Sequence, residues 1–227
     1  MAEPRFRYER YAAPTGQEWM MVHGIGAPCV MLLPPLFGEA NFTRALIVGV
    51  ARRLATADLG VAIPDLPGTG ESERRIEDIG WEDWRAAAAA AADHVAHANG
   101  SPPHLIALRG GALIDDACIG ASRFRFAAAT GASLLRQMER AQAIGDRESG
   151  RSRSPSTLVE LTGYRLAPSL VDPLRAATPF AAAGALHDST FAGPGAAPWR
   201  RAEPSNDAAL AAQLASEVLD WIAQCGA

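Results

Sequence analysis

A chain of 227 residues, 48% hydrophobic and 20% charged, has the composition of a soluble globular protein large enough to bury its own core. The formal net charge of −4 leaves no basic footprint for nucleic acid, and the three cysteines have neither metal-ligand spacing nor a disulfide pattern. All 21 basic residues are arginine, which excludes lysine-based mechanisms. We expect one α/β domain over residues 1–227, with no metal and no cofactor.

No apolar stretch of the sequence is long enough to cross a bilayer. The first residues, MAEPRFRYERY, lack the apolar core of a signal peptide. These observations predict a cytoplasmic protein without a membrane span.

The first half of the chain alternates predicted strands and helices, which is typical of a mostly parallel sheet with helices on both faces. A helix is expected to begin near Thr43, a plausible N-cap residue. Its apolar stripe is Leu46, Ile47, Val50 and Leu54. The predicted strands cover residues 29–33, 60–63, 104–108 and 123–130, and a further helix covers roughly residues 81–98.

The second half is less regular. Residues 133–144 are predicted to be helical, with Leu134, Leu135 and Met138 directed inward. Residues 145–157 are polar and rich in Gly, Ser and Arg, which predicts a flexible surface loop. A short strand is expected near residues 158–161, a Pro-interrupted helix near 167–177, and a last helix from Asn206 or Asp207.

Residues 104–114, HLIALRGGALI, combine a buried strand, a tight glycine turn and an expected helix start. Small residues at Ala107 and Gly111 flank a central position, as in the G-x-S-x-G nucleophile elbow. The central residue is Arg109, and a guanidinium is protonated at any useful pH and cannot attack a carbonyl. The covalent step of a serine hydrolase is therefore in doubt for this chain.

Three interpretations of Arg109 remain open. Its planar fork, beside the amides of Gly110 and Gly111 at a helix N-terminus, would bind a carboxylate or phosphate. Alternatively it is tied to a nearby carboxylate, Asp65 or Glu39, and only locks the loops together. A third possibility is a catalytic role of another kind.

Few histidines of the sequence are placed to serve as a catalytic base. Only His187 lies late enough in the chain for the Ser…Asp…His order of hydrolase triads. Asp188 and Ser189 next to it make a polar cluster, which a strand end or turn explains equally well. His187 is thus a candidate base with an ordinary structural alternative.

Two loops follow predicted strands and are candidates to line a cleft. In PPLFGEANFTR, residues 34–44, the two prolines carry no N–H, so any oxyanion donor must come from Leu36 or Phe37. Polar side chains in this loop either line a cleft or cap the next helix and face solvent; they are Glu39, Asn41 and Arg44. Asp65 begins the turn DLPGTGES, whose glycines permit a sharp bend.

The chain resembles the α/β-hydrolase superfamily and, within it, the exosortase A system-associated hydrolases of the second type. The superfamily resemblance rests on residues 29–57, on DLPGTGES and on the elbow. The narrower resemblance rests on PPLFGEANFTR (34–44), LRGGAL (108–113), TGYRLAPSL (162–170) and APWRRAE (197–203). It implies an α/β-hydrolase fold, and an arginine at the elbow is usual in that family.

The resemblance marks Arg109, Glu39, Asn41, Asp65 and Trp199 for a cleft. It implies a bacterial cytoplasmic protein linked to exopolysaccharide production and exosortase sorting, with a pathway protein as a possible partner. The chain is short between residues 177 and 206, so an abbreviated cap and C-terminal part are expected. The leading function is a hydrolase-like accessory protein that binds a small anionic or acylated ligand at the elbow.

Two alternatives remain. One is a slow ester or thioester hydrolase, with a water activated by His187 or a carboxylate and with Arg109 stabilising the oxyanion. The other is a non-catalytic scaffold for protein interactions, because a fold does not fix a function.

Overall fold

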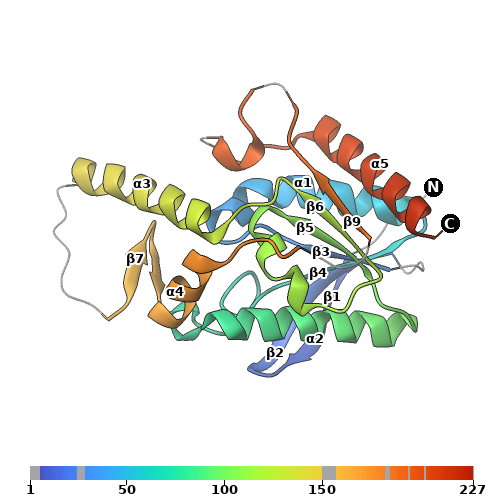
Figure 1. Cartoon of the computed structure of the whole chain (residues 1–227), viewed down its shortest axis with the longest axis horizontal. Helices are drawn as coiled ribbons and strands as arrows, with labels where there is room; N and C mark the ends of the chain where they lie inside the picture. Colours follow the sequence, from blue (N-terminus) through green and yellow to red (C-terminus); the bar gives the residue numbers. More distant parts are fainter. Residues whose placement is uncertain are drawn as a thin grey trace.

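The structure is a computed structural model that describes residues 6–24, 29–149, 157–181, 185–193, 195–201 and 203–226. Figure 1 shows the elements in chain order. The strands are β1 (Phe6–Ala13), β2 (Gly16–His23), β3 (Cys29–Leu33), β4 (Gly60–Pro64), β5 (His104–Leu108), β6 (Ser122–Phe126), β7 (Val159–Leu161), β8 (Tyr164–Leu166) and β9 (Leu186–Ser189). The helices are α1 (Gly38–Thr56), α2 (Trp81–Asn99), α3 (Gly131–Ser149), α4 (Pro168–Ala176) and α5 (Ala208–Cys225).

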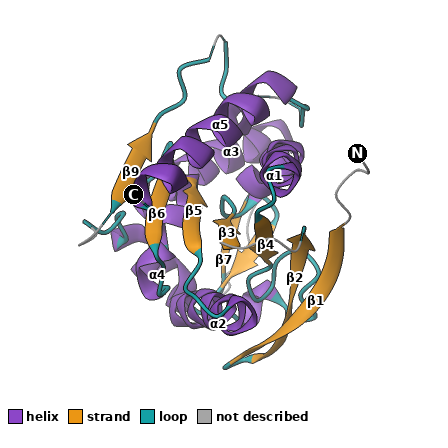
Figure 2. Ribbon diagram, turned by 90° about the vertical axis from the view of Figure 1, so that its right-hand side faces the viewer, coloured by secondary structure: helices purple, strands orange, loops and turns teal. Residues whose placement is uncertain are grey.

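The described part of the chain forms a main sheet of seven strands, in the order β1-β2-β4-β3-β5-β6-β9. From β4 to β9 all neighbours are parallel, and β2 and β1 continue the sheet antiparallel. Helices α1 and α5 cover one face, and α2 and α4 lie on the other (Figures 1 and 2). Strands β3, β4 and β5 are wholly buried, as expected for strands covered on both faces. The predicted mostly parallel sheet with helices on both faces is confirmed.

Strands β1 and β2 form an N-terminal hairpin that the sequence analysis did not assign. Charged and aromatic residues alternate along β1, and Phe6 and Tyr8 stay exposed at the sheet edge. The turn closes at Gly16, whose φ of 134° is readily adopted only by glycine. Period-two alternation before a tight turn is the signal that would have revealed the hairpin.

The hairpin buries a carboxyl group without a partner. Glu18 of β2 is 0% exposed, and neither of its carboxylate oxygens has a hydrogen-bond partner among the described residues. Burial raises the pKa of Glu18, and the nearby Ser72 hydroxyl and Arg74 guanidinium lower it by less. The folded state therefore holds a proton on Glu18 more tightly than the unfolded state does.

Because the pKa of Glu18 is raised, removal of its carboxyl group should benefit the free energy of unfolding more at neutral pH than at acidic pH. Stability of the wild type falls as the pH rises from the unfolded-state pKa through the folded-state pKa of Glu18, because the folded state then loses its proton at a cost. The free energy of unfolding of Glu18→Gln minus that of the wild type should be about 1–3 kcal/mol larger at pH 7 than at pH 4. Urea unfolding of both proteins at the two pH values measures this, and an equal difference at both would contradict it.

Two predicted helices are longer than expected. Helix α1 begins at Gly38 instead of near Thr43, and the Thr43 hydroxyl is buried and donates to the Glu39 carbonyl one turn earlier at 2.8 Å. A threonine that bonds back in this way sits inside a helix and does not cap it. The predicted apolar stripe of α1 is buried as expected.

Helix α3 runs on to Ser149, so residues 145–149 of the predicted flexible loop are helical. The Gln142 amide donates to the Asp146 carboxylate at 2.6 Å, an i,i+4 pair that supports this extension. Residues 150–156 of the predicted loop lie outside the described residues. Leu134, Leu135 and Met138 face inward as predicted.

Strand β6 is shorter than predicted, because it ends at Phe126 where Ala127 turns to a left-handed φ of 50°. The last helix, α5, begins at Ala208, next to the expected start at Asn206 or Asp207, and the Asp207 carboxylate caps it by accepting from the Leu210 amide at 3.0 Å. Between β6 and β9 the described chain adds only α3, the hairpin β7–β8 and α4 (Figure 1). This small insertion agrees with the expected abbreviated cap.

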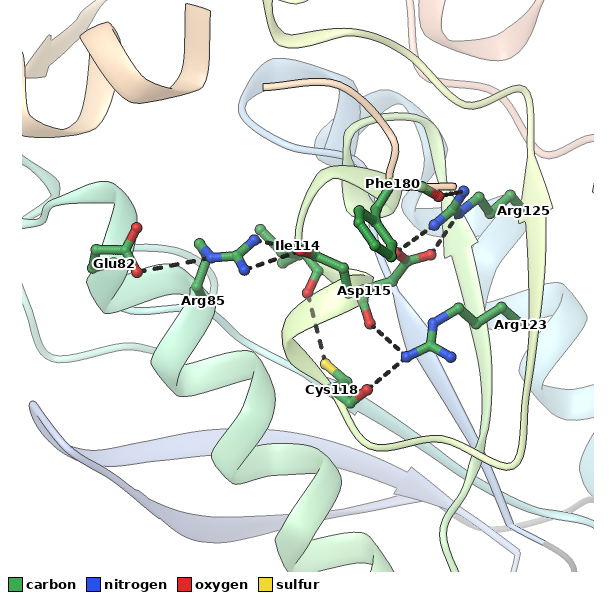
Figure 3. Close-up of polar contacts among 9 residues, drawn as sticks. Glu82, Arg85, Ile114, Asp115, Cys118, Arg123, Arg125 and Phe180 are labelled. Atoms are coloured by element: carbon green, nitrogen blue, oxygen red, sulfur yellow. Dashed lines mark hydrogen bonds and ion pairs between the residues drawn. The ribbon is translucent and has the colours of Figure 1, made fainter. Parts of the chain in front are cut away.

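The strand that carries the elbow is not followed by an α-helix. A helix does begin at the expected place, but the chain forms two short 3-10 helices, η2 (Arg109–Leu113) and η3 (Asp115–Ala117), in place of a long helix. Figure 3 shows arginines from α2 and β6 gathered around this segment. Tertiary contacts hold the segment in a shape that its local sequence does not specify.

Those arginine contacts are short and well directed. Arg125 donates to both carboxylate oxygens of Asp115, at 2.7 and 2.8 Å, and to the Phe180 carbonyl at 2.7 Å (Figure 3). Arg123 donates to the Cys118 carbonyl at 2.8 Å. Arg85 of α2 makes a bidentate pair with the adjacent Asp116, at 2.7 and 3.0 Å.

Candidate functional site

The backbone at Arg109 keeps the strained turn expected of a nucleophile elbow. Arg109 follows β5 directly and has a φ of 52°, a left-handed value that costs a non-glycine residue about 1–3 kcal/mol. A Cβ atom at Gly111 would lie 2.4 Å from the Leu33 carbonyl oxygen, so only glycine fits there. The turn is therefore retained although the hydroxyl nucleophile is replaced.

The guanidinium of Arg109 is engaged on several sides. Its Nε and Nη2 donate to the two carboxylate oxygens of Glu39, at 3.1 and 2.9 Å, and its Nη1 donates to the Ala127 carbonyl at 3.0 Å. The Trp199 ring covers it, with the Arg109 Cζ 4.7 Å from the ring centroid. Of the two carboxylates considered from the sequence, Glu39 makes this pair.

The ion pair of Arg109 and Glu39 is almost withdrawn from solvent. The two side chains are 11% and 10% exposed, and Trp199 is 6% exposed. Burial raises the pKa of Glu39, and the hydrogen bonds and charge of Arg109 oppose that shift. Because the pair is bidentate, an anion binding to this guanidinium would have to displace the Glu39 carboxylate.

Trp199 reaches the elbow from the segment between β9 and α5. It belongs to the short helix η4 (Pro198–Arg200) and packs edge-on against Phe126 and Phe191, with ring centroids 6.0 and 5.9 Å away. The two phenyl rings hold the indole above the guanidinium. The resemblance marks both Trp199 and Arg109 for a cleft, and the structure brings the two side chains into contact.

His187 is placed away from the elbow. It lies on the edge strand β9, in register with Phe124 of β6, whereas Arg109 follows β5 on the far side of β6. Its imidazole is exposed and stacks on Phe124 at 4.9 Å between ring centroids, with Trp221 of α5 at 5.6 Å. None of the polar contacts in the described part links His187 to Arg109 or Glu39, so its catalytic role stays a prediction.

A pocket of about 170 Å³ lies between the loop after β3 and helix α3, and we call it the elbow pocket. It brings together four residues predicted to bind ligand: Leu36, Phe37, Glu39 and Trp199. Its other walls were not predicted; they are Gly38, Phe42, Leu134, Gln137, Met138, Ala141 and Thr162. Leu36 and Leu134 of this wall also crowd Gly110, where a Cβ atom would lie within 3.0 Å of each.

A second pocket, of about 260 Å³, lies on the other side of the same loop, and we call it the Arg44 pocket. It contains the remaining predicted residues Asn41 and Asp65, together with Leu36 and Phe37. Arg109, Gly110 and Gly111 line neither pocket. Six of the nine predicted ligand-binding residues thus line one or both of two cavities that share the Leu36–Phe37 wall, and the three elbow residues line neither.

Asp65 shapes the turn that closes the second pocket. Its carbonyl accepts from the Tyr11 hydroxyl at 2.7 Å, and its Oδ2 accepts from the Glu71 amide at 3.0 Å. Gly70 approaches so closely that a Cβ atom would meet the Asp65 carboxylate at 2.2 Å. Burial raises the pKa of Asp65, while the Glu71 amide and Arg44 lower it.

The cysteines of the core are poor nucleophiles. Burial raises the pKa of Cys29 to about 11 and that of Cys118 to about 12, so both thiols stay protonated at neutral pH. Within the described ranges, no three His, Cys, Asp or Glu side chains gather closely enough to hold a metal ion. Among the helices described, none is both long and apolar enough to span a membrane.

Comparisons with known proteins bear on the fold. No protein-family model and no curated protein sequence matches the chain. It is similar in structure to a protein assigned as a hydrolase from Agrobacterium vitis S4, with 13% identity, coverage of 97% of this chain and 100% of that one, and a TM-score of 0.53. The chain therefore has the α/β-hydrolase fold that the sequence resemblance implies.

Other similar structures match only part of the chain. A serine hydrolase without a lid from Xanthomonas campestris has 15% identity over 56% of this chain and 63% of its own, with a TM-score of 0.47. An epoxide hydrolase from Vigna radiata has 18% identity over 56% of this chain and 39% of its own, with a TM-score of 0.42. The chain thus covers less than two thirds of the length of these two proteins.

Proposed function

We propose that this chain is a hydrolase-like accessory protein of a bacterial exopolysaccharide and exosortase system, which binds a small acylated ligand beside the elbow without forming an acyl-enzyme. The observation that carries the proposal is the closed ion pair between Arg109 and Glu39 at the position of the nucleophile. A protonated guanidinium cannot attack an acyl group, and three of the five N–H donors of Arg109 already bond Glu39 and Ala127.

The elbow pocket supports an acylated ligand over an anionic one. Its walls are mainly apolar, and its one ionisable side chain is Glu39, which would repel an anion. Arg109 does not offset this repulsion for an incoming anion, because its charge is already balanced by the same carboxylate. A short acyl chain on a neutral sugar fits these walls, and the sequence resemblance supports the exopolysaccharide setting.

Binding and catalysis are tested together with one neutral acylated sugar and one chromogenic ester. Wild-type protein should bind N-butanoylglucosamine in calorimetry and should hydrolyse p-nitrophenyl butyrate no faster than buffer. Gln137→Trp fills the elbow pocket from a partly exposed position and should weaken binding at least tenfold. Val48→Trp, which fills the other pocket, is the matched control and should bind as the wild type does.

Three results would contradict the proposal. Absence of binding to N-butanoylglucosamine would contradict the proposed ligand site. Ester hydrolysis abolished by Glu39→Gln or His187→Ala would instead favour the slow hydrolase with an activated water. Deletion of the coding gene in its host with unchanged exopolysaccharide would remove the pathway assignment.

Arg109→Ser tests whether the strained turn alone restores chemistry. A serine at this position needs an adjacent base, and His187 is exposed and stacked on Phe124 beyond β6. We expect neither the wild type nor Arg109→Ser to be labelled covalently by a fluorophosphonate. Labelling of the variant at residue 109 would show that a base does reach the elbow.

A further inference from the structure

Arg44 differs from the other arginines that surround the core of the sheet. Arg85, Arg109 and Arg125 each hold a carboxylate in a bidentate pair. The side chain of Arg44 is exposed, and its contact is the Tyr8 hydroxyl at 3.5 Å, which is long for a hydrogen bond. Among the described residues no carboxylate lies within ion-pair distance of it.

This unpaired guanidinium lines a cavity. Arg44 projects from α1 into the Arg44 pocket, the space of about 260 Å³ enclosed by α1, the loop after β3, the turn after β4 and the edge of the β1–β2 hairpin. Most of the lining side chains are apolar: Met21, Pro34, Pro35, Leu36, Phe37, Ala40, Ile47, Val48, Ile63, Leu66 and Ile76. A mainly apolar cavity with few polar groups is the usual form of a small-molecule site.

The polar side chains of the pocket offer one positive and one negative charge. Arg44 supplies the positive charge, with Tyr8 and Asn41 beside it on the lining. Asp65 supplies the carboxyl group, and its Oδ2 already accepts from the Glu71 amide. Arg44 and Asp65 both line the cavity and are not paired with each other, so a ligand group can reach Arg44 without breaking an ion pair.

We propose that the Arg44 pocket binds a small monocarboxylic acid whose carboxylate pairs with Arg44 and whose apolar body fills the cavity. At about 30 Å³ for each water-sized group, the volume corresponds to a body of roughly eight carbon atoms. An arginine fork matches a carboxylate in two parallel hydrogen bonds, and the apolar lining can contact the body of the ligand. This site goes beyond the proposed function, because it is separate from the elbow and does not involve Arg109.

The two charged side chains of the pocket, Arg44 and Asp65, lead to an expected preference among ligands. A chain of the same length with a carboxylate at each end would carry a second negative charge into a pocket whose lining has one cationic side chain, Arg44, and one carboxyl group, Asp65. An amine of the same length would be repelled by Arg44. We therefore expect octanoate to bind, and suberate and octylamine to bind at least tenfold more weakly.

The test is calorimetric titration of the full chain with octanoate, suberate and octylamine. Arg44→Gln removes the charge at an exposed position and should weaken octanoate binding about tenfold or more. Val48→Trp fills the cavity and should abolish binding. Arg136→Gln, an exposed arginine on α3 outside the pocket, is the matched control and should bind like the wild type, with thermal unfolding confirming that each variant is folded.

The outcomes separate this site from the elbow. Loss of octanoate binding in Arg44→Gln but not in Gln137→Trp supports the proposal, whatever the elbow pocket does with an acylated sugar. Loss in Gln137→Trp with normal binding in Arg44→Gln would locate octanoate in the elbow pocket and overturn it. Equal binding of octanoate and octylamine, or no heat with millimolar octanoate, would also overturn it.

Discussion

Arg125→Met is expected to lower the free energy of unfolding by about 3–5 kcal/mol, because it leaves the Asp115 carboxylate buried without its partner. The Arg125 and Asp115 side chains are 3% and 0% exposed, and two hydrogen bonds of 2.7 and 2.8 Å join them. The same change removes the donor to the Phe180 carbonyl (Figure 3). Urea unfolding monitored by circular dichroism measures the loss.

The loss of stability in Arg125→Met should increase as the pH rises. Burial raises the pKa of Asp115 and Arg125 opposes that shift, so the pKa rises further when Arg125 is removed. A carboxyl group with a raised pKa in the folded state destabilises the protein increasingly as the pH rises above its unfolded-state pKa. The difference between wild type and Arg125→Met should therefore be smaller at pH 4 than at pH 7.

A neighbouring pair serves as the control for this effect. Arg85 and Asp116 make the same bidentate contact on the same segment, but their side chains are 26% and 24% exposed. Water can solvate Asp116 when its partner is lost, so Arg85→Met should cost only about 1 kcal/mol. Equal losses for Arg85→Met and Arg125→Met would contradict the desolvation argument.

Arg109→Met should lower the free energy of unfolding by about 3 kcal/mol, because Glu39 would be left nearly buried and unpaired. The change also frees the Trp199 ring and the Ala127 carbonyl that the guanidinium contacts. If the ion pair is the cause, the double variant Arg109→Met with Glu39→Met should recover most of the loss, since no charge then remains buried.

The control for Arg109 is an exposed pair of similar length. Arg175 and Glu139 are joined at 2.7 Å, and their side chains are 47% and 41% exposed. Arg175→Met should change stability by less than about 1 kcal/mol, as is usual for surface ion pairs. A loss in Arg109→Met that the double variant does not recover would show that the backbone at the turn, and not the pair, carries the effect.

These expectations share one physical origin. At the elbow, Arg109 stands at the position of the serine hydroxyl in the G-x-S-x-G pattern. Two 3-10 helices follow it in place of an α-helix. Arg109 closes the turn onto the loop after β3, and Arg85, Arg123 and Arg125 hold the two 3-10 helices beyond it. The scaffold of a hydrolase is thereby kept while its reactive position becomes a buried ion pair.

Some residues near the elbow could be identified from the sequence, and others could not because their positions depend on tertiary packing. Glu39 and Trp199 do meet Arg109, and both had been marked by the family resemblance. Tyr8 could not be assigned to a pocket from the sequence, because the hairpin that carries it was not assigned. Leu134 and Gln137 were missed as pocket walls, because the position of α3 against the loop after β3 depends on tertiary packing.

The amino-acid sequence by itself determined the buried strands, the apolar stripes of the helices and the loss of the serine nucleophile. Each of these depends on residue type and local period: CVMLL is apolar throughout, HLIAL is apolar after His104, and no local context gives a guanidinium a nucleophilic lone pair at neutral pH. Only the tertiary structure decided which carboxylate pairs with Arg109, that His187 stacks on Phe124 beyond β6, and that Arg44 lines a cavity without an ion pair to any described residue. Those outcomes depend on distances between segments far apart in the chain, which sheet order and loop packing set and residue spacing does not.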